Sequence, residues 1–407
     1  MKVNNAGIEA TDLCRELSKR SSRNAQPNNL TTKNTSSRCF FNTIFSLTYN
    51  NRNPLTKILR DKMTEQSILK GPGKLLDAQG NLNQAGWATR QVLDCNLEDC
   101  NFYALKFLQG IRIKVWDYYA VTTPTHFYSF TISDVGYIGM VFAYVIEFAT
   151  GKYQEQTLTL PFASGVKLPR NSDSGESTYK GGGKTLRFNV DGTKRTLSVR
   201  WPGFGTTTLN AEIEFTVPSE HESMTIVIPI PDKRFYYNRK INCMPASGWV
   251  EYDGSRFEIK PESSLGNLDW GRGVWEYDSF WVWASASGFL KDHRTIGLNL
   301  GYGFGDTSAA TENAIILDGK IHKLGEVKFT YDNKDFKAPW KMVSPDGRLD
   351  LVFTPFFERV AKTDLKVLRS EVHQMFGRYN GTVVTDDGKK IEIKDLVGWA
   401  EEHNARW

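Results

Sequence analysis

The sequence lacks the cysteine pattern of a disulfide-stabilised or zinc-binding protein. Its five cysteines among 407 residues, Cys14, Cys39, Cys95, Cys100 and Cys243, are odd in number and form no C-x-x-C pair. A disulfide framework needs an even set of cysteines, and a zinc module needs paired ligands. We therefore expect reduced cysteines, no metal site and a cytoplasmic protein.

No apolar run is long enough for a transmembrane helix. The most apolar stretch, residues 137–146 (YIGMVFAYVI), is half the roughly 20 residues that a helical span needs, and Asp134 and Glu147 flank it. The N-terminus also lacks the apolar centre of a signal peptide. The sequence therefore predicts a soluble protein.

Acidic residues are absent between Leu17 and Arg60. Residues 1–62 carry eleven Lys and Arg against four Asp and Glu, whereas the remainder carries 40 against 42. The basic surplus therefore belongs to this segment, and the rest has no basic face for specific nucleic-acid binding. We predict a disordered basic tail over residues 1–62; the alternative is a mitochondrial transit peptide.

Nucleotide and hydrolase motifs are absent as well. Gly183-Lys184-Thr185 resembles the end of a phosphate-binding loop, but Thr178 stands where its first glycine is required. Residues 301–306 (GYGFGD) lack the third glycine of a dinucleotide fingerprint. Neither G-x-S-x-G nor H-E-x-x-H occurs, so we expect no cofactor.

The sequence is rich in signals of antiparallel β-structure. Asp-Gly pairs, which suit tight hairpin turns, separate β-branched or aromatic runs. They lie at Asp191-Gly192, Asp253-Gly254, Asp318-Gly319, Asp346-Gly347 and Asp387-Gly388. Residues 211–217 alternate apolar and polar side chains, which predicts a strand buried on one side.

The length and the need to hide sheet edges favour two barrels. We predict an all-β chain with an N-terminal β-barrel over residues 63–240 and a C-terminal β-barrel over residues 241–407. A short helix is expected over residues 80–93. The stretch 230–248 interrupts the alternation and carries two prolines, so we interpret it as the loop that joins the barrels.

Several blocks of sequence, in order, resemble a known family. They are DWGRGVWEYDSFWVWASASG, RTIGLNLGYGFGD, TENAIILDGKIHKLGEV, FTPFFERVAKTDLKVLRSEVHQMFG and the ending GWAEEHNARW. Over about residues 71–407 the chain resembles the domain of unknown function 2804 (DUF2804) family. The resemblance implies a shared fold but no established activity.

A more distant resemblance lies in residues 247–273 (SGWVEYDGSRFEIKPESSLGNLDWGRG). This segment is similar to the joint of AttH-like and carotenoid 1,2-hydratase proteins, which are tandem lipocalin-like β-barrels; some hydrate, cyclise or isomerise polyenes. The resemblance implies the same pair of lipocalin-like barrels here. Those proteins have a His after the Asp, whereas Trp270 follows Asp269 directly in this chain.

The tryptophan-rich stretch 267–288 is the candidate ligand site. In an extended conformation Trp281, Trp283, Ser285 and Ser287 share one face, which is large, aromatic and dotted with hydroxyls. Apolar ligand pockets are lined in this way. The alternative is that the rings only fill a barrel or the contact between barrels.

These observations leave three hypotheses. The first is a protein that binds an apolar or lipid-like small molecule in a Trp-rich barrel pocket. Its candidate ligand-binding residues are Trp270, Arg272, Trp275, Tyr277, Trp281, Trp283 and Arg369. The second is a cofactor-independent hydratase, isomerase or cyclase acting on a polyene-like substrate, in which Asp269, Glu371 or His373 moves a proton. The third is a scaffold without a small ligand.

Overall fold

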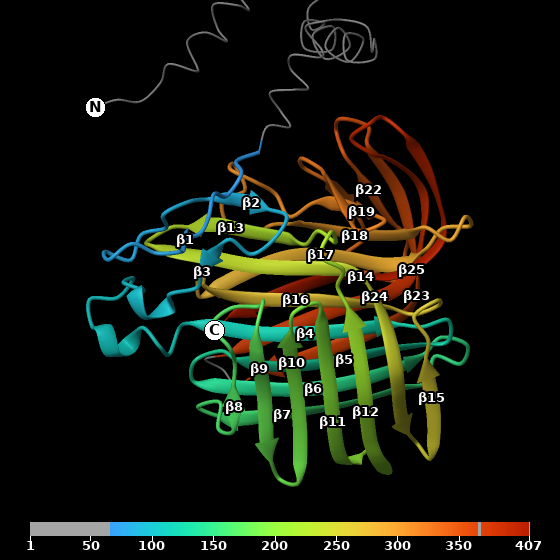
Figure 1. The fold of residues 1–407 in the computed structure, drawn as a ribbon, viewed down its shortest axis with the longest axis horizontal. Helices are drawn as coiled ribbons and strands as arrows, with labels where there is room; N and C mark the ends of the chain where they lie inside the picture. Colours follow the sequence, from blue (N-terminus) through green and yellow to red (C-terminus); the bar gives the residue numbers. More distant parts are fainter. Residues whose placement is uncertain (1–65, 365–367, 407) are drawn as a thin grey trace, which may run out of the picture. The chain divides into compact units, whose positions relative to one another are not determined.

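The described part of the chain is built almost entirely from β-strands (Figure 1). The structure is a computed structural model that describes residues 66–364 and 368–406, which belong to one compact unit, Met63–Trp407. The predicted tail over residues 1–62 lies outside the described residues. Two short 3-10 helices, η1 (Leu97–Asp99) and η2 (Lys106–Leu108), are the helical elements within the described residues.

The first sheet has fourteen strands and is antiparallel. Its main order is β7-β6-β5-β4-β16-β14-β12-β11-β10-β9-β8, and β13, β2 and β15 pair beside this path. The strands are β2 (Gly86–Ala88), β4 (Lys114–Thr122), β5 (His126–Asp134), β6 (Ile138–Glu147), β7 (Tyr153–Pro161), β8 (Val166–Lys167), β9 (Gly175–Gly181), β10 (Lys184–Asp191), β11 (Lys194–Phe204), β12 (Thr207–Thr216), β13 (Met224–Ile230), β14 (Arg234–Tyr252), β15 (Ser255–Ile259) and β16 (Leu265–Val274). A separate parallel pair joins β1 (Gly73–Lys74) to β3 (Leu93–Asp94).

The second sheet has nine antiparallel strands in the order β20-β19-β18-β17-β25-β24-β23-β22-β21. The strands are β17 (Asp278–Phe289), β18 (Thr295–Tyr302), β19 (Ala314–Leu317), β20 (Lys320–Lys323), β21 (Lys328–Thr330), β22 (Trp340–Val343), β23 (Leu349–Asp364), β24 (Arg369–Val384) and β25 (Lys390–Arg406). Both sheets curl strongly into half-barrels (Figure 1). The prediction of an all-β chain with two antiparallel β-barrels is confirmed, and the barrels take the form of two strongly curled half-barrel sheets.

The hairpin turns occur where the Asp-Gly pairs predicted them. Each of the five pairs lies at the turn between two consecutive strands that pair with each other, with Asp191 as the last residue of β10. In the turn between β14 and β15, Asp253 and Gly254 have φ angles of 52° and 75°. Two positive φ angles define the two-residue turn whose twist matches that of the flanking strands.

Two other expectations from the sequence are wrong. Residues 80–93 form no helix; they contain β2 and the start of β3, which are held by pairing with other strands. Residues 230–248 are not a joining loop, because most of this stretch lies in β14. The alternation fails there because residues 235–243 are buried on both faces of the strand. The buried positions include polar side chains, those of Asn238, Arg239, Lys240 and Asn242, so neither alternation nor an apolar run marks this strand in the sequence.

A β-bulge divides strand β14 into two parts. The pairing of β14 with β16 shifts register between Ile241 and Met244, and Cys243 has a φ of 60°. Before the bulge, Tyr237 and Ile241 point into the first half-barrel; after it, Met244 and Ala246 do so. The bulge therefore exchanges odd and even positions. The predicted boundary between residues 240 and 241 falls inside this strand, and the change of sheet comes later, between β16 and β17.

The apolar core has three locations. One cluster, which includes Trp270, fills the first half-barrel, and another, which includes Trp340, fills the second. Further clusters lie between the two sheets, where Phe127 packs edge-on against Trp399 with 5.3 Å between ring centroids. Contact between the sheets thus buries large aromatic side chains, which contribute much apolar area.

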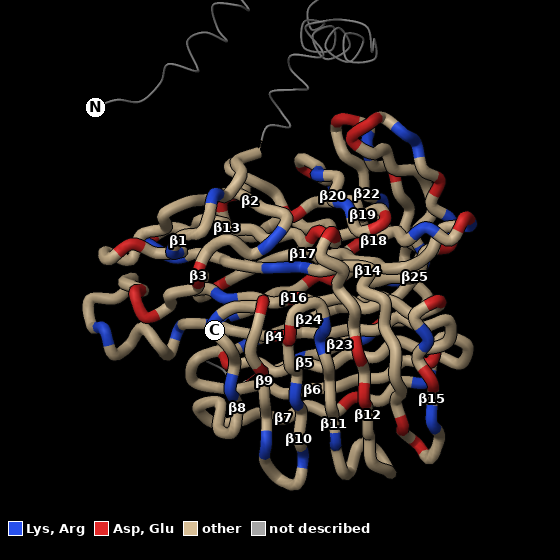
Figure 2. The backbone as a smooth tube through the Cα atoms, viewed as in Figure 1, with Lys and Arg blue, Asp and Glu red and all other residues tan. Residues whose placement is uncertain are grey.

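Charged residues of both signs are interspersed along the described strands (Figure 2). Within residues 66–364 and 368–406, no helix is long and apolar enough to cross a membrane. The cysteines of the described residues, Cys95, Cys100 and Cys243, are buried and unbridged. Cys14 and Cys39 lie outside the described residues.

The close approach of strands at Gly248 provides a test of the fold. We expect Gly248→Ala to lower the free energy of unfolding by roughly 3 kcal/mol, because an added Cβ would lie 2.0 Å from the Glu212 carbonyl oxygen and φ is 123°. Gly254→Ala is the control: its φ is also positive, but the Cβ meets no neighbour, so a loss of roughly 1 kcal/mol is expected. Urea unfolding measures both. Equal losses would contradict the strand contact.

Candidate functional site

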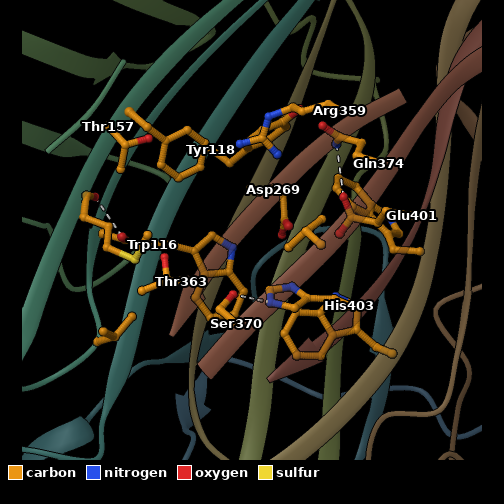
Figure 3. Close-up of a pocket in the computed structure, with 18 of the residues that line it drawn as sticks. Trp116, Tyr118, Thr157, Asp269, Arg359, Thr363, Ser370, Gln374, Glu401 and His403 are labelled. Atoms are coloured by element: carbon orange, nitrogen blue, oxygen red, sulfur yellow. Dashed lines mark hydrogen bonds between the residues drawn. The ribbon is translucent and has the colours of Figure 1, made fainter. Parts of the chain in front are cut away.

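A cavity of about 430 Å³ lies between the two sheets (Figure 3). The first sheet contributes β4, β5, β6, β7, β14 and β16 to its walls, and the second contributes β17, β23, β24 and β25. The interiors of both half-barrels are filled by apolar clusters. The cavity therefore lies between the half-barrels, whereas the sequence predicts a pocket inside one barrel.

Aromatic rings form most of the apolar wall. They are Trp116, Tyr118, Phe142, Tyr144, Tyr236, Trp275, Trp281, Trp283 and Phe304. Strand alternation explains the contribution of β17: Trp281 and Trp283 face the cavity, while Val282 and Ala284 point into the second half-barrel. The predicted alternation of this strand is confirmed.

The exposed lining residues mark the mouth of the cavity. Thr157 on β7 and Val360 and Lys362 on β23 line the cavity and are exposed to solvent. These strands belong to different sheets, so the opening lies where the two sheets separate. A small molecule could enter there without disrupting a hydrogen-bonded ladder.

Four of the predicted site residues line this cavity, namely Asp269, Trp275, Trp281 and Trp283. The other six lie elsewhere. Trp270 and Arg272 point into the first half-barrel, where Arg272 forms an ion pair of 3.0 Å with Asp117. Tyr277 is 42% exposed and lies between β16 and β17.

The predicted acid–base residues Glu371 and His373 also lie outside the cavity. Val372 and Gln374 line it, so Glu371 and His373, at alternate positions of β24, face the other side of the strand. His373 Nδ1 lies 2.9 Å from Glu358 Oε1. Arg369 pairs with Glu371 at 2.9 Å, also outside the cavity.

Asp269 is held in a buried network of charges. Asn238 donates a hydrogen bond of 2.6 Å to Asp269 Oδ1, and Lys240 Nζ lies 3.2 Å from the same oxygen. Lys240 also lies 3.7 Å from Glu312 Oε2, and its ammonium stands 4.1 Å from the centroid of the Trp283 ring. A buried ammonium is stabilised by such carboxylates and by the ring face.

Glu401 ends a chain of hydrogen bonds that crosses from one sheet to the other. Tyr118 and Tyr144 of the first sheet join their hydroxyls at 3.1 Å, and Tyr144 donates to Gln374 Oε1 at 2.9 Å. Gln374 Nε2 donates to Glu401 Oε2 at 3.0 Å. Burial raises the pKa of Glu401 to about 7. Near neutral pH this carboxyl group can both hold and release a proton.

His403 lies two residues after Glu401 on the same face of β25. Its Nε2 is 2.8 Å from Ser370 Oγ, and its ring centroid is 4.0 Å from that of Trp281. Burial, with a further contribution from the positive charge of Arg359, lowers the pKa of His403 to about 3. The imidazole is therefore neutral at physiological pH and acts as a hydrogen-bonding group.

A second ion pair joins the two sheets beside the cavity. Arg359 on β23 donates to both carboxylate oxygens of Glu155 on β7, at 3.0 Å and 2.7 Å. Its guanidinium also stands 4.5 Å from the centroid of the Tyr144 ring. Paired hydrogen bonds of this kind fix the geometry of arginine and carboxylate groups.

Several polar residues of the cavity were not predicted from the sequence. Trp399, Glu401 and His403 alternate on one face of β25, so the buried aromatic residue two positions before Glu401 was the available signal. Lys240 was missed because its stretch was interpreted as a loop. Among the described residues no group of three or more His, Cys, Asp or Glu side chains could hold a metal ion.

The fold and the cavity define an all-β protein in which two curled sheets enclose a space of ligand size. Residues 65–407 match the model of the family described as "Domain of unknown function (DUF2804)". The chain therefore belongs to the DUF2804 family, as its sequence predicts. A comparison with curated proteins finds no match.

Solved structures show a similar fold at low sequence identity. CghA, solved with Sch210972, has a TM-score of 0.47 and 11% identity, over 82% of this chain and 97% of that chain. A putative AttH from Nitrosomonas europaea has a TM-score of 0.42 and 13% identity, over 77% and 98%. Kievitone hydratase from Nectria haematococca has a TM-score of 0.42 and 12% identity, over 83% and 98%. This likeness concerns the fold alone.

Burial of Glu401 predicts a specific dependence of stability on pH. Its pKa in the folded protein, about 7, exceeds the ordinary value of 4.5, so the folded state binds the proton more tightly than the unfolded state. The stabilisation is complete below pH 4.5 and is lost as the pH rises through 7. Between these limits, we expect the unfolding free energy of the wild type relative to Glu401→Gln to fall by about 3 kcal/mol.

Urea unfolding at a series of pH values measures this difference. Glu392→Gln, at an exposed position of the same strand, is the control. Burial of His403 also makes the unfolding free energy depend on pH, but it does so alike in the wild type and in Glu401→Gln. The difference between the two proteins therefore largely cancels this contribution. A difference that does not vary with pH would contradict the assignment.

Proposed function

We propose that the protein binds a small, mostly apolar molecule in the cavity between its two sheets. The observation that carries this proposal is a cavity of about 430 Å³ with aromatic walls in a protein whose half-barrels are packed. Protein interiors are normally close-packed, because empty space forfeits contacts for the atoms that line it. Ligand pockets typically occupy about 300 to 1,000 Å³ and have mainly apolar walls.

Polar groups at one side of the cavity give the bound molecule an orientation. Asp269, Gln374, Glu401 and His403 all line the cavity, and Figure 3 shows these side chains directed into the space between the sheets. A few fixed donors and acceptors among apolar walls are typical of specific small-molecule sites. A scaffold without a ligand would need neither the cavity nor these groups.

Filling the cavity should abolish binding without unfolding the protein. Ala361 lies on β23 and lines the cavity, so we expect Ala361→Trp to occupy the space that the ligand needs. Mass spectrometry of compounds extracted from the gently purified full chain should detect an apolar molecule in the wild type and not in this variant. Thr354→Trp, at an exposed position of the same strand, is the matched control and should retain the molecule.

Circular dichroism would establish that both variants are folded. Recovery of the same compounds from the wild type and from Ala361→Trp would show that they bind elsewhere. If no specific compound is recovered from the wild type, that result would count against a tightly held ligand.

One observation favours a second candidate function, a cofactor-independent hydratase, isomerase or cyclase. Glu401, with a pKa of about 7, lies among aromatic walls that could stabilise a carbocation. In such a reaction the carboxyl O–H bond breaks and a C–H bond forms on a carbon–carbon double bond. The cation then loses a proton from a neighbouring carbon to the Glu401 carboxylate, or adds water and releases the proton of that water.

Proton transfer can be detected without knowing the overall reaction. The compound recovered from the wild type should gain deuterium at carbon when it is incubated with the protein in D₂O. We expect Glu401→Gln to slow this incorporation by about 100-fold or more while still binding the compound. Mass spectrometry measures the label, and Glu392→Gln is the control. Unchanged deuterium incorporation in Glu401→Gln would contradict the role of this residue. If the wild type incorporates no deuterium, the enzyme hypothesis fails and only the binding function remains.

A further inference from the structure

The buried charges around the cavity do not balance. Its lining includes four carboxyl groups, those of Glu155, Asp269, Glu312 and Glu401, and two buried cations, Lys240 and Arg359. A third cation, Lys362, also lines the cavity, but its side chain is 52% exposed and pairs with Glu371 on the other side of the sheet. The enclosed space therefore holds an excess of acidic groups.

The ion pairs identify the group in excess. Arg359 is engaged by Glu155, and Lys240 lies between Asp269 and Glu312. Within the described residues, no Lys or Arg nitrogen lies within 4.0 Å of Glu401. The Glu401 side chain is nonetheless buried, with 8% of the residue exposed, and it faces the cavity. A buried carboxylate without a counter-ion is costly, which explains its raised pKa.

Lys240 illustrates how this cavity holds a cation. Its ammonium lies between two carboxylates and above the face of Trp283. Glu401 and Trp281, both on the second sheet, offer the same two kinds of group, a carboxyl group and an indole that line the cavity. Aromatic faces together with carboxylates are the usual means of recognising ammonium groups.

We propose that the molecule bound in this cavity carries a positive charge: a mostly apolar compound with a basic or quaternary nitrogen, which lies between Glu401 and the aromatic wall around Trp281. The inference rests on the proposed function, since it concerns the ligand of the same cavity. The ligand nitrogen supplies the counter-ion that Glu401 lacks, and the apolar part of the molecule contacts the remaining rings.

Affinity for a cation should rise with pH. Burial raises the pKa of Glu401 to about 7, while Arg359 and Lys240 lower it and Asp269 raises it. Burial also raises the pKa of Glu312, and His403 stays neutral. Burial lowers the pKa of Lys114, whose ammonium is 5.6 Å from the Trp275 ring, and of Lys323, near Glu312, to about 7. Loss of charge from these lysines would favour a cation in the same pH range, so the experiment must separate them from Glu401.

A pair of probes of equal shape tests the charge directly. The cationic probe is (2-naphthylmethyl)trimethylammonium, and the neutral probe is 2-(2,2-dimethylpropyl)naphthalene, in which carbon replaces nitrogen. Binding to the full chain is followed by tryptophan fluorescence at about pH 6 and about pH 8, on either side of the Glu401 pKa. We expect the cation to bind about tenfold or more tightly than the neutral probe at the higher pH, and to lose much of this advantage at the lower pH.

Glu401→Gln should bind both probes alike, with little dependence on pH. A pH dependence that persists in this variant would assign the effect to Lys114, Lys323 or Glu312 and overturn the role of Glu401. If the neutral probe binds as tightly as the cation at the higher pH, the charge inference fails while the proposed apolar cavity stands. If neither probe binds to the wild type and Ala361→Trp behaves in the same way, both proposals fail.

Discussion

The ion pair between Arg359 and Glu155 joins the two sheets where the cavity separates them. Arg359 belongs to the second sheet and Glu155 to the first, and both side chains are largely removed from water. Two charges leave water at a large cost, which two well-aligned hydrogen bonds and the Tyr144 ring help to offset. Removal of either partner would leave the other charge buried, so this contact constrains the relative position of the sheets.

The hydrogen-bond chain from Tyr118 to Glu401 adds a second constraint at the same place. Two tyrosines of the first sheet reach Gln374 and Glu401 of the second across the cavity. Hydrogen bonds depend on direction as well as distance, so they fix the angle between the sheets more narrowly than aromatic packing does. The groups that set this angle also line the cavity, and the shape of the site is therefore coupled to the contact between the sheets.

The fold could be predicted from local patterns because the type of each strand or turn depends mainly on its own few residues. The Asp-Gly turns and the alternation in β12 and β17 gave correct elements, and the sequence blocks gave the family. Strand β14 was not predicted because burial on both faces removes alternation. For the same reason Lys240, which lies on this strand, was not predicted as a residue of the cavity. Glu371 and Arg369 were predicted as site residues because they are charged residues within a strand. In the structure, strand alternation places their side chains on the face of β24 that points away from the cavity.

The location of the cavity could not be predicted, since it depends on how two separate sheets meet. Asp269 and Glu401 are far apart in the sequence, and no local pattern relates them. The rings of β17 could equally have filled a barrel or its outer contact. Only the packing of one sheet against the other shows that Trp281 and Trp283 border an open space while Trp270 is fully enclosed in a core.

The bulge of β14 has a consequence for how chains of this family can vary in length. Because the extra residue at Asn242–Cys243 exchanges the two faces, one strand supplies Lys240 to the cavity and Met244 to the first half-barrel. Deletion of one residue there would leave Ile241 and Met244 two positions apart, as in a regular strand, so both parts of β14 would keep their faces and only the local bend would be lost. Relatives without this residue can therefore keep the same cavity and the same half-barrel with a straighter strand, whereas a single deletion elsewhere in β14 would turn the side chains on one side of it to the wrong face.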